Sequence, residues 1–136
     1  MTSNPQVMRV GIAGLGVAAA LAMPEIQSHP HVQIVAGADP RQAARDAFAA
    51  QFGAETYASI EELCASSAVD LVYIFTPNRF HATHAVLAAE HGKQIILDKP
   101  LGISMEEADR AIAAAERNDV RLLVGHPKAW MRRSVR

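Results

Sequence analysis

The sequence has one cysteine, few aromatic residues and almost no net charge. A single cysteine, Cys64, excludes an internal disulfide. A net charge of −1 gives no general attraction for nucleic acid or an anionic membrane surface. Aromatic residues make up 5% of the chain, too few for a platform on which bases stack. We therefore expect neither a nucleic-acid partner nor a membrane partner.

Long hydrophobic runs are also absent. No segment approaches the roughly 20 apolar residues that span a bilayer. The first five residues, MTSNP, have neither the basic start nor the apolar core of a signal peptide. The expected location is a reducing cytoplasm. The 136 residues, half of them hydrophobic, suit one globular domain whose core needs no disulfide or structural metal.

Short apolar runs alternate with helical patterns along the chain. Strands are predicted at 7–13, 32–38, 54–57, 71–75, 94–97 and 122–124. Helices are predicted at 17–27, 40–52, 59–66, 78–90 and from 104 onward, two of them opened by capping boxes at Ser59 and Ser104. In such a box the Ser and Glu side chains each bond the other's exposed backbone N–H. Gly53 and Gly92 are the predicted ends of two helices.

The strands are apolar on successive residues, which burial on both faces requires. A helical crossover separates each pair, so the sheet is predicted to be parallel with helices on both sides. Right-handed crossovers and a glycine turn after the first strand favour an α/β, doubly wound parallel sheet (Rossmann fold). The expected strand order is 3-2-1-4-5-6.

A Gly14-x-Gly16-x-x-Ala19 motif follows the first strand and opens the first helix. Gly14 would permit the tight turn, Gly16 would let the backbone approach a pyrophosphate, and Ala19 would allow close helix packing. The pyrophosphate would sit on the positive helix end, against Val17 and Ala18. By itself the motif is weak, because any strand-to-helix turn can use glycine.

An acidic residue, Asp39, ends the second strand 25 positions after Gly14. There a carboxylate can accept both hydroxyls of an adenosine ribose, which predicts NAD in preference to NADP. Arg41 could turn outward to meet a 2′-phosphate, so NADP is the less favoured cofactor. The alternative role for Asp39 is a helix N-cap ahead of Pro40, and the two roles are compatible.

Several short motifs occur in a fixed order from about residue 9 to residue 125. They are VGIAGLG at 10–16, ADP at 38–40, Thr76-Pro77-Asn78 with His81, HGK at 91–93 and DKPL at 98–101. Together they resemble the Gfo/Idh/MocA oxidoreductases. Within that family they look most similar to the phthalate dihydrodiol (4,5-dihydroxyphthalate) dehydrogenase branch.

The resemblance implies hydride transfer between nicotinamide and a hydroxyl-bearing carbon of a dihydrodiol, sugar or inositol. Lys99 matches the catalytic-site lysine, whose ammonium would polarise the reacting oxygen. Pro100 matches a proline often preceded by a cis peptide bond, which would aim Lys99 at the cleft. Asp98 stands where glutamate is usual and, being one methylene shorter, would make a weaker cofactor contact. The alternative for Lys99 is an ordinary surface lysine before a proline.

The resemblance also assigns the loop after the third long strand to the cofactor. Thr76, Pro77 and Asn78 match the segment that runs under the cofactor, and His81 matches a position near the nicotinamide ribose. Plain turn and helix-cap chemistry is the alternative for these residues. His81-x-x-His84 lacks a carboxylate or thiol to complete a metal site, so no metal is expected.

Cys64 is expected to be a packed thiol, and His84 a surface or cap residue. His126 could face a substrate carboxylate, although a loop histidine is as often without a role.

Residues 1–125 are predicted to form the dinucleotide-binding domain and residues 126–136 the start of a link. Family members carry a second domain after this strand, so we expect this chain to bind cofactor without efficient turnover. The chain could be a fragment of a longer enzyme or a free-standing domain. The surface that a second domain would cover could also drive self-association, so a homo-oligomer is possible. The competing hypotheses are a non-catalytic NAD(H)-sensing or interaction module and, less favoured, a methyltransferase.

Overall fold

A computed structural model describes residues 7–98 and 100–125 of the chain. Helices and strands alternate through these residues. In order they are β1 (Met8–Ala13), α1 (Val17–Ser28), β2 (Val32–Ala38), α2 (Gln42–Phe52), β3 (Glu55–Tyr57), α3 (Ile60–Ala65), β4 (Leu71–Ile74), the 3-10 turn η1 (Asn78–Phe80), α4 (His81–Glu90), β5 (Gln94–Leu97), α5 (Met105–Arg117) and β6 (Leu122–Val124).

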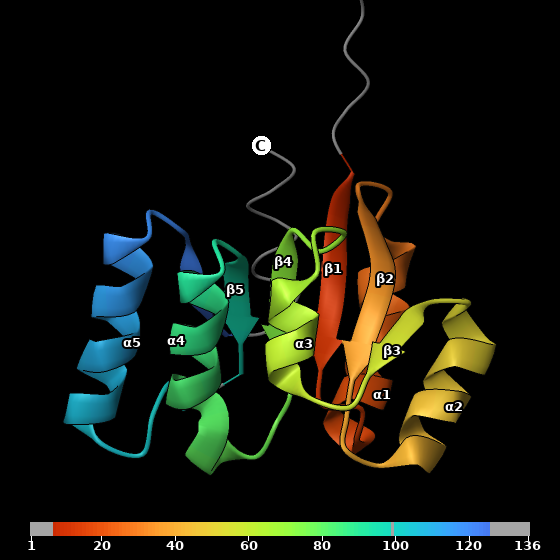
Figure 1. The fold of residues 1–136 in the computed structure, drawn as a ribbon, viewed down its shortest axis with the longest axis horizontal. Coiled ribbons are helices and arrows are strands. Elements are labelled where there is room, and N and C mark those ends of the chain that lie inside the picture. Colours follow the sequence, from red (N-terminus) through yellow and green to blue (C-terminus); the bar gives the residue numbers. More distant parts are fainter. Residues whose placement is uncertain (1–6, 99, 126–136) are drawn as a thin grey trace, which may run out of the picture.

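The strands form one parallel sheet in the order β3-β2-β1-β4-β5-β6. The predicted fold class and strand order are therefore confirmed. The chain starts in the centre of the sheet, builds outward to β3, and crosses back to β4 beside β1. In Figure 1 the strand arrows point downward, so the carboxyl ends of the strands lie along the lower edge.

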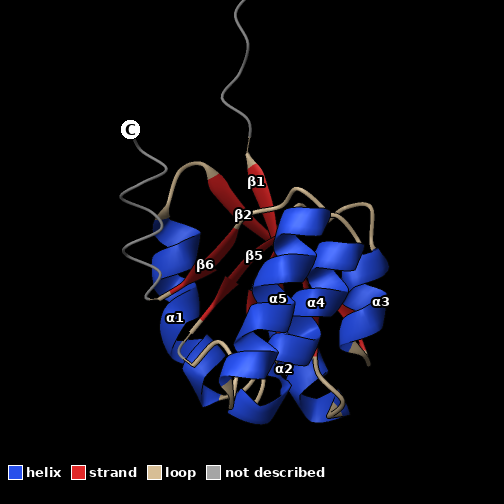
Figure 2. Ribbon diagram, turned by 90° about the vertical axis from the view of Figure 1, so that its left-hand side faces the viewer, coloured by secondary structure: helices blue, strands red, loops and turns tan. Residues whose placement is uncertain are grey.

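Two hydrophobic clusters cover the two faces of the sheet. One joins α3, α4 and α5 to the strands, and the other joins α1 and α2 to the opposite face. Figure 2 shows the sheet between α1 on one side and α3, α4 and α5 on the other. In β4, Val72 and Ile74 enter the first cluster, while Leu71 and Tyr73 enter the second. This alternation explains why successive strand residues are apolar.

Helix ends follow the predicted signals with two differences. Ser59 and Ser104 each accept the N–H of the residue three positions later, Glu62 and Glu107, as N-caps do. The capping box predicts that the Glu62 carboxylate accepts the backbone N–H of Ser59. In the structure this carboxylate instead accepts a hydrogen bond from the Ser59 hydroxyl.

The second difference concerns α2 and α4. Helix α2 begins at Gln42, two residues later than predicted, and α4 is preceded by the turn η1. The Asp39 carboxylate accepts the N–H of Arg41, a turn that keeps these residues outside the helix. No helix within residues 7–98 and 100–125 is long and apolar enough to cross a membrane.

Candidate functional site

The turns after β1, β2 and β4 meet at the carboxyl edge of the sheet and enclose a cleft of about 650 Å³. Small-molecule sites in proteins fall in this range of volume, and open α/β sheets bind ligands at this edge. Six of the predicted site residues line the cleft, namely Gly14, Gly16, Asp39, Arg41, Thr76 and Pro77. The topology therefore brings together residues as far apart in the sequence as Gly14 and Pro77, 63 positions (77 − 14).

Gly14 sits where the turn after β1 touches the loop after β4. Its φ of +93° is in the region that favours glycine. A Cβ added there would lie 2.9 Å from the backbone carbon of Phe75 and from the backbone nitrogen of Thr76. Both the conformation and the close approach of backbone therefore require glycine at this position.

The N-terminus of α1 opens beside the same cleft. Gly16 is its N-cap, with no side-chain hydrogen bond to the first turn and no acidic residue in that turn. Helices α3 and α5, in contrast, each have a serine cap and two glutamates there. Val17 and Ala18 are exposed, while Ala19 is fully buried against the sheet, as close packing requires. The helix end is thus suited to an anion from outside the chain.

Asp39 is buried next to the glycine turn, with 5% of its surface exposed. Its carboxylate accepts the backbone N–H groups of Leu15 and Arg41, each at 2.9 Å. The Arg41 guanidinium donates to both carboxylate oxygens, at 2.9 and 3.0 Å. These side-chain bonds hold the pKa of Asp39 at about 2, against the effect of burial.

The alternative role predicted for Asp39, the N-cap of the following helix, is wrong. The N-cap of α2 is Arg41, and it has no side-chain capping bond. Asp39 instead ties the glycine turn to the loop after β2.

Two histidines hold the loop after β4. Thr76 Oγ1 lies 2.8 Å from His84 Nδ1, and the Thr76 carbonyl accepts from His81 Nε2 at 2.8 Å. The other nitrogen of His81, Nδ1, lies 2.7 Å from the Pro100 carbonyl oxygen. Both ring nitrogens of His81 therefore lie within hydrogen-bond distance of a carbonyl oxygen. His81, which is 2% exposed, thus ties the carboxyl end of β4 to the segment after β5.

Among the remaining predicted residues, Asn78 is exposed at the start of η1, and Asp98 and Pro100 are exposed after β5. Lys99 and His126 lie outside the described residues, as does the predicted 126–136 link. The assignment of Lys99 as the catalytic lysine therefore stays a prediction.

The cleft also has walls that sequence reasoning missed. Arg79 stacks its guanidinium 4.7 Å above the Phe80 ring, and Phe80 stacks on His84 with ring centroids 5.6 Å apart. The turn from β3 into α3 contributes Ala58, Ser59 and Ile60. A usable signal existed, because β3 ends at the same edge, but Ser59 was interpreted only as a cap. His84, expected at the surface or in a cap, is half-buried, and burial lowers its pKa.

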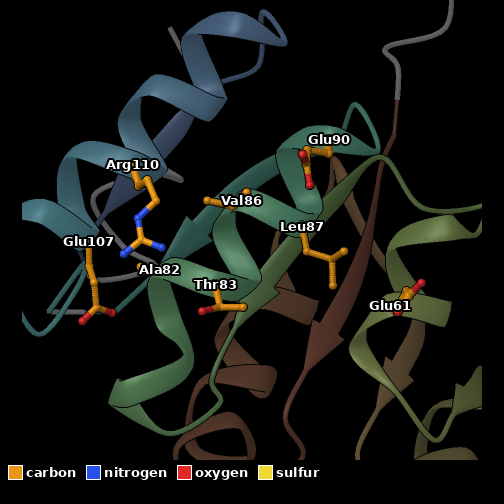
Figure 3. A pocket seen from close by; sticks show the side chains of 8 residues that line it. All are labelled: Glu61, Ala82, Thr83, Val86, Leu87, Glu90, Glu107 and Arg110. Atoms are coloured by element: carbon orange, nitrogen blue, oxygen red, sulfur yellow. The ribbon is translucent and has the colours of Figure 1, made fainter.

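Within the described residues, no group of three or more His, Cys, Asp or Glu side chains could hold a metal ion. Cys64 is fully buried, and burial raises its pKa to about 11, as expected for a packed thiol. A second hollow, of about 420 Å³, lies on the outer side of α4 between Glu61 of α3 and Arg110 of α5 (Figure 3). It includes no residue of the strand-end turns.

The sequence profile of the Gfo/Idh/MocA group, described as an oxidoreductase family with an NAD-binding Rossmann fold, matches residues 8–126. The chain belongs to this family. The resemblance predicted from the motifs is therefore confirmed at the level of the family.

Individual relatives agree. The chain is 39% identical, over 90% of its length, to a 1-carboxy-3-chloro-3,4-dihydroxycyclohexa-1,5-diene dehydrogenase from Comamonas testosteroni. It is 38% identical, over 56% of its length, to scyllo-inositol 2-dehydrogenase (NADP(+)) from Bacillus subtilis. The crystal structure of a putative dehydrogenase from Bordetella bronchiseptica superposes with a TM-score of 0.84 at 43% identity over 88% of the chain.

The matched region is a part of each relative. It covers 31%, 24% and 32% of these three proteins, respectively. The chain thus spans at most about a third of their length.

Proposed function

We propose that this chain is the NAD(H)-binding part of a dehydrogenase that acts on a cyclic, hydroxylated small molecule. The observation that supports this most is the placement of an uncapped helix N-terminus and a buried carboxylate on two walls of one cleft. A dinucleotide needs this combination, since its pyrophosphate is anionic and its adenosine ribose offers two hydroxyl donors.

The residues present fit such a cofactor. Gly16 and the first turn of α1, with Val17 and Ala18, would hold the pyrophosphate, because no side chain caps the backbone N–H groups of that turn. Asp39 would accept the ribose hydroxyls, and Thr76, Pro77 and Asn78 would form the floor beneath the cofactor. The nicotinamide, when bound, supplies the site that accepts or donates hydride.

NAD is the proposed cofactor in preference to NADP. The Asp39 carboxylate, held ionised by its low pKa, would repel a 2′-phosphate. The name of the inositol dehydrogenase above specifies NADP(+), so relatives of this chain include NADP-dependent enzymes. A direct comparison of the two cofactors is therefore part of the test below.

Lys99 is proposed as the catalytic residue. Its ammonium would polarise the substrate oxygen and stabilise the negative charge that develops as the hydroxyl proton leaves. His81 would support this role indirectly, by bonding the carbonyl of the adjacent Pro100. Asp98 is proposed as a cofactor contact at the same strand end.

The proposed substrate class follows the names of the two curated relatives, a dihydroxycyclohexadiene dehydrogenase and an inositol dehydrogenase. A phthalate-type dihydrodiol is the first candidate, as the motifs predicted. Since the chain covers 31% and 24% of these two enzymes, we expect it to bind cofactor without efficient turnover.

The test is a titration of the purified chain with NADH and NADPH, followed by nicotinamide fluorescence. We expect NADH to bind at micromolar concentration and more tightly than NADPH, with no oxidation of a dihydrodiol when NAD⁺ is supplied. Failure of both cofactors to bind would overturn the proposal. Robust dehydrogenation by this chain would overturn only the expectation on turnover.

A further inference from the structure

The Asp39 carboxylate has no acceptor site left for a ligand. An ionised carboxylate offers about four lone-pair positions on its two oxygens. Two are taken by the backbone N–H groups of Leu15 and Arg41, and two by Nε and Nη2 of the Arg41 side chain. The two backbone bonds belong to the fold of the turns. The two guanidinium bonds are the ones that can be given up.

The side chain of Arg41 has room to move away from Asp39. Its side chain is 63% exposed, while that of Asp39 is 6% exposed, so the guanidinium approaches the carboxylate from the open side of the cleft. It also reaches over the glycine turn. A Cβ built on Gly16 would lie 3.9 Å from Arg41 Nη2. In this position the guanidinium stands between solvent and the Asp39 carboxylate, beside the glycine turn.

We propose that Arg41 is a specificity-determining latch that closes the ribose subsite and must swing out before NAD(H) can bind. This inference rests on the proposed function of the cleft. A ribose has to displace both guanidinium bonds, so Arg41 opposes the binding of NAD(H). The guanidinium and the ribose compete for the same two lone-pair positions.

For NADP(H) the same residue acts in the opposite direction. A 2′-phosphate brings negative charge toward Asp39, and a guanidinium between the two anions offsets their repulsion. Arg41 would therefore weaken the binding of NADH and strengthen the binding of NADPH. It would thus reduce the preference for NADH over NADPH that Asp39 alone would produce. A single side chain then sets the ratio of the two affinities.

The first test measures dissociation constants of NADH and NADPH for the wild-type chain and for Arg41→Met, which keeps the aliphatic stem. We expect Arg41→Met to bind NADH about two- to fivefold more tightly, the range that an exposed ion pair covers. We expect its affinity for NADPH to fall about tenfold or more, as loss of a charged hydrogen bond predicts. The matched control is Arg110→Met, an exposed arginine of α5 outside the cleft, which should leave both constants unchanged.

The second test observes the latch directly by the ¹H–¹⁵N signal of Arg41 Nε. In the free chain this signal should be displaced from that of an unbonded arginine, and saturation with NADH should return it there. The proposal would be overturned if the Nε signal did not change on saturation with NADH. It would also be overturned if Arg41→Met weakened the binding of NADH and of NADPH equally. If the wild-type chain binds neither NADH nor NADPH, the proposed function itself fails, so the two failures are distinguishable.

Discussion

The two ends of the parallel sheet use their polar groups in opposite ways. At the amino end, Arg9 bonds both carboxylate oxygens of Asp70, at 2.9 and 3.0 Å. Nearby, Lys93 Nζ donates to the carbonyls of Ser66 and Val69, each at 2.7 Å. These side chains tie β1 and the turn before β5 to the turn before β4. A hollow at the amino end is lined by Arg9, Val69 and Asp70, whose polar groups take part in these bonds.

At the carboxyl end the polar groups face a cleft instead. The N-terminus of α1 has no cap, and the Asp39 carboxylate is satisfied partly by an arginine that stands in the opening. Every strand of the parallel sheet has its amino end at one edge and its carboxyl end at the other. The two edges therefore differ because of their turns and because the helix N-termini present backbone N–H groups at the carboxyl edge. The polar groups at the amino end therefore stabilise the fold, while those at the carboxyl end are suited to contact a ligand.

The largest expected effect comes from Gly14→Ala at the carboxyl end. The new Cβ would meet backbone atoms at 2.9 Å in a strained conformation, so we expect about 3 kcal/mol of destabilisation and loss of NADH binding. Denaturant unfolding and fluorescence titration measure the two effects. The control is Gly92→Ala at the amino end, whose φ is also positive, at +75°, but whose Cβ would meet nothing within 4 Å.

That control should lose about 1 kcal/mol from conformational strain and keep its affinity for NADH. Equal loss of NADH binding in both variants would remove the distinction between the two ends.

Asp39→Asn should have the next largest effect, because it removes the charged acceptor at the carboxyl end. We expect NADH affinity to fall about tenfold. Because the folded pKa of Asp39, about 2, lies below its ordinary 3.8, its contribution is present above pH 4 and lost as pH falls toward 2. The contribution is about 1–2 kcal/mol, since solvent partly screens the exposed guanidinium.

Wild-type stability should therefore fall more steeply between pH 4 and pH 2 than that of Asp39→Asn, as measured by urea unfolding. Parallel pH profiles would contradict the assignment of this ion pair.

At the amino end, Lys93→Met should affect stability alone. It leaves the carbonyls of Ser66 and Val69 without their side-chain donor, at a cost of about 1–2 kcal/mol. The Lys93 side chain is half-buried, and burial lowers its pKa, so the methionine stem should pack in its place. Thermal unfolding should report the loss, and the NADH titration should match that of the wild type. A weaker titration would show that the two ends are coupled.

The smallest effect is expected for Asp70→Asn. The Arg9–Asp70 pair is exposed, with side-chain exposures of 44% and 36%, so its removal should cost less than about 1 kcal/mol at neutral pH. Arg9 lowers the pKa of Asp70, so this small contribution too should vanish in acid. Urea unfolding at high salt, where the difference from the wild type should shrink further, checks this expectation.

The sequence predicted the scaffold of the site better than its contacts. Strand positions, the order of the sheet and the turn at Gly14 follow from local patterns, because burial on both faces and a positive φ leave few residue choices. The delayed start of α2 did not follow, because it depends on a bond from Arg41 to the Asp39 side chain. The polar partners of the Arg41 side chain are only two residues away, but the residue pattern does not indicate which way such a long side chain turns.

The same limit explains why the role of His84 was missed. Its bond to Thr76 joins a helix to the preceding loop, and its burial depends on how α4 packs on the sheet. Helical spacing indicates which residues share a face, but it does not indicate which loop that face will cover.

The most direct test of the central claim is a ¹H–¹⁵N NMR titration of this chain with NADH, followed residue by residue. We expect the largest shifts at the carboxyl end, on Gly14, Leu15, Gly16, Asp39, Arg41 and Thr76. The amide signals of Arg9, Asp70 and Lys93 at the amino end, and of Val86 and Arg110 at the hollow in Figure 3, should stay unchanged. Shifts concentrated at the amino end or in that hollow, or no shifts at saturating NADH, would contradict the claim.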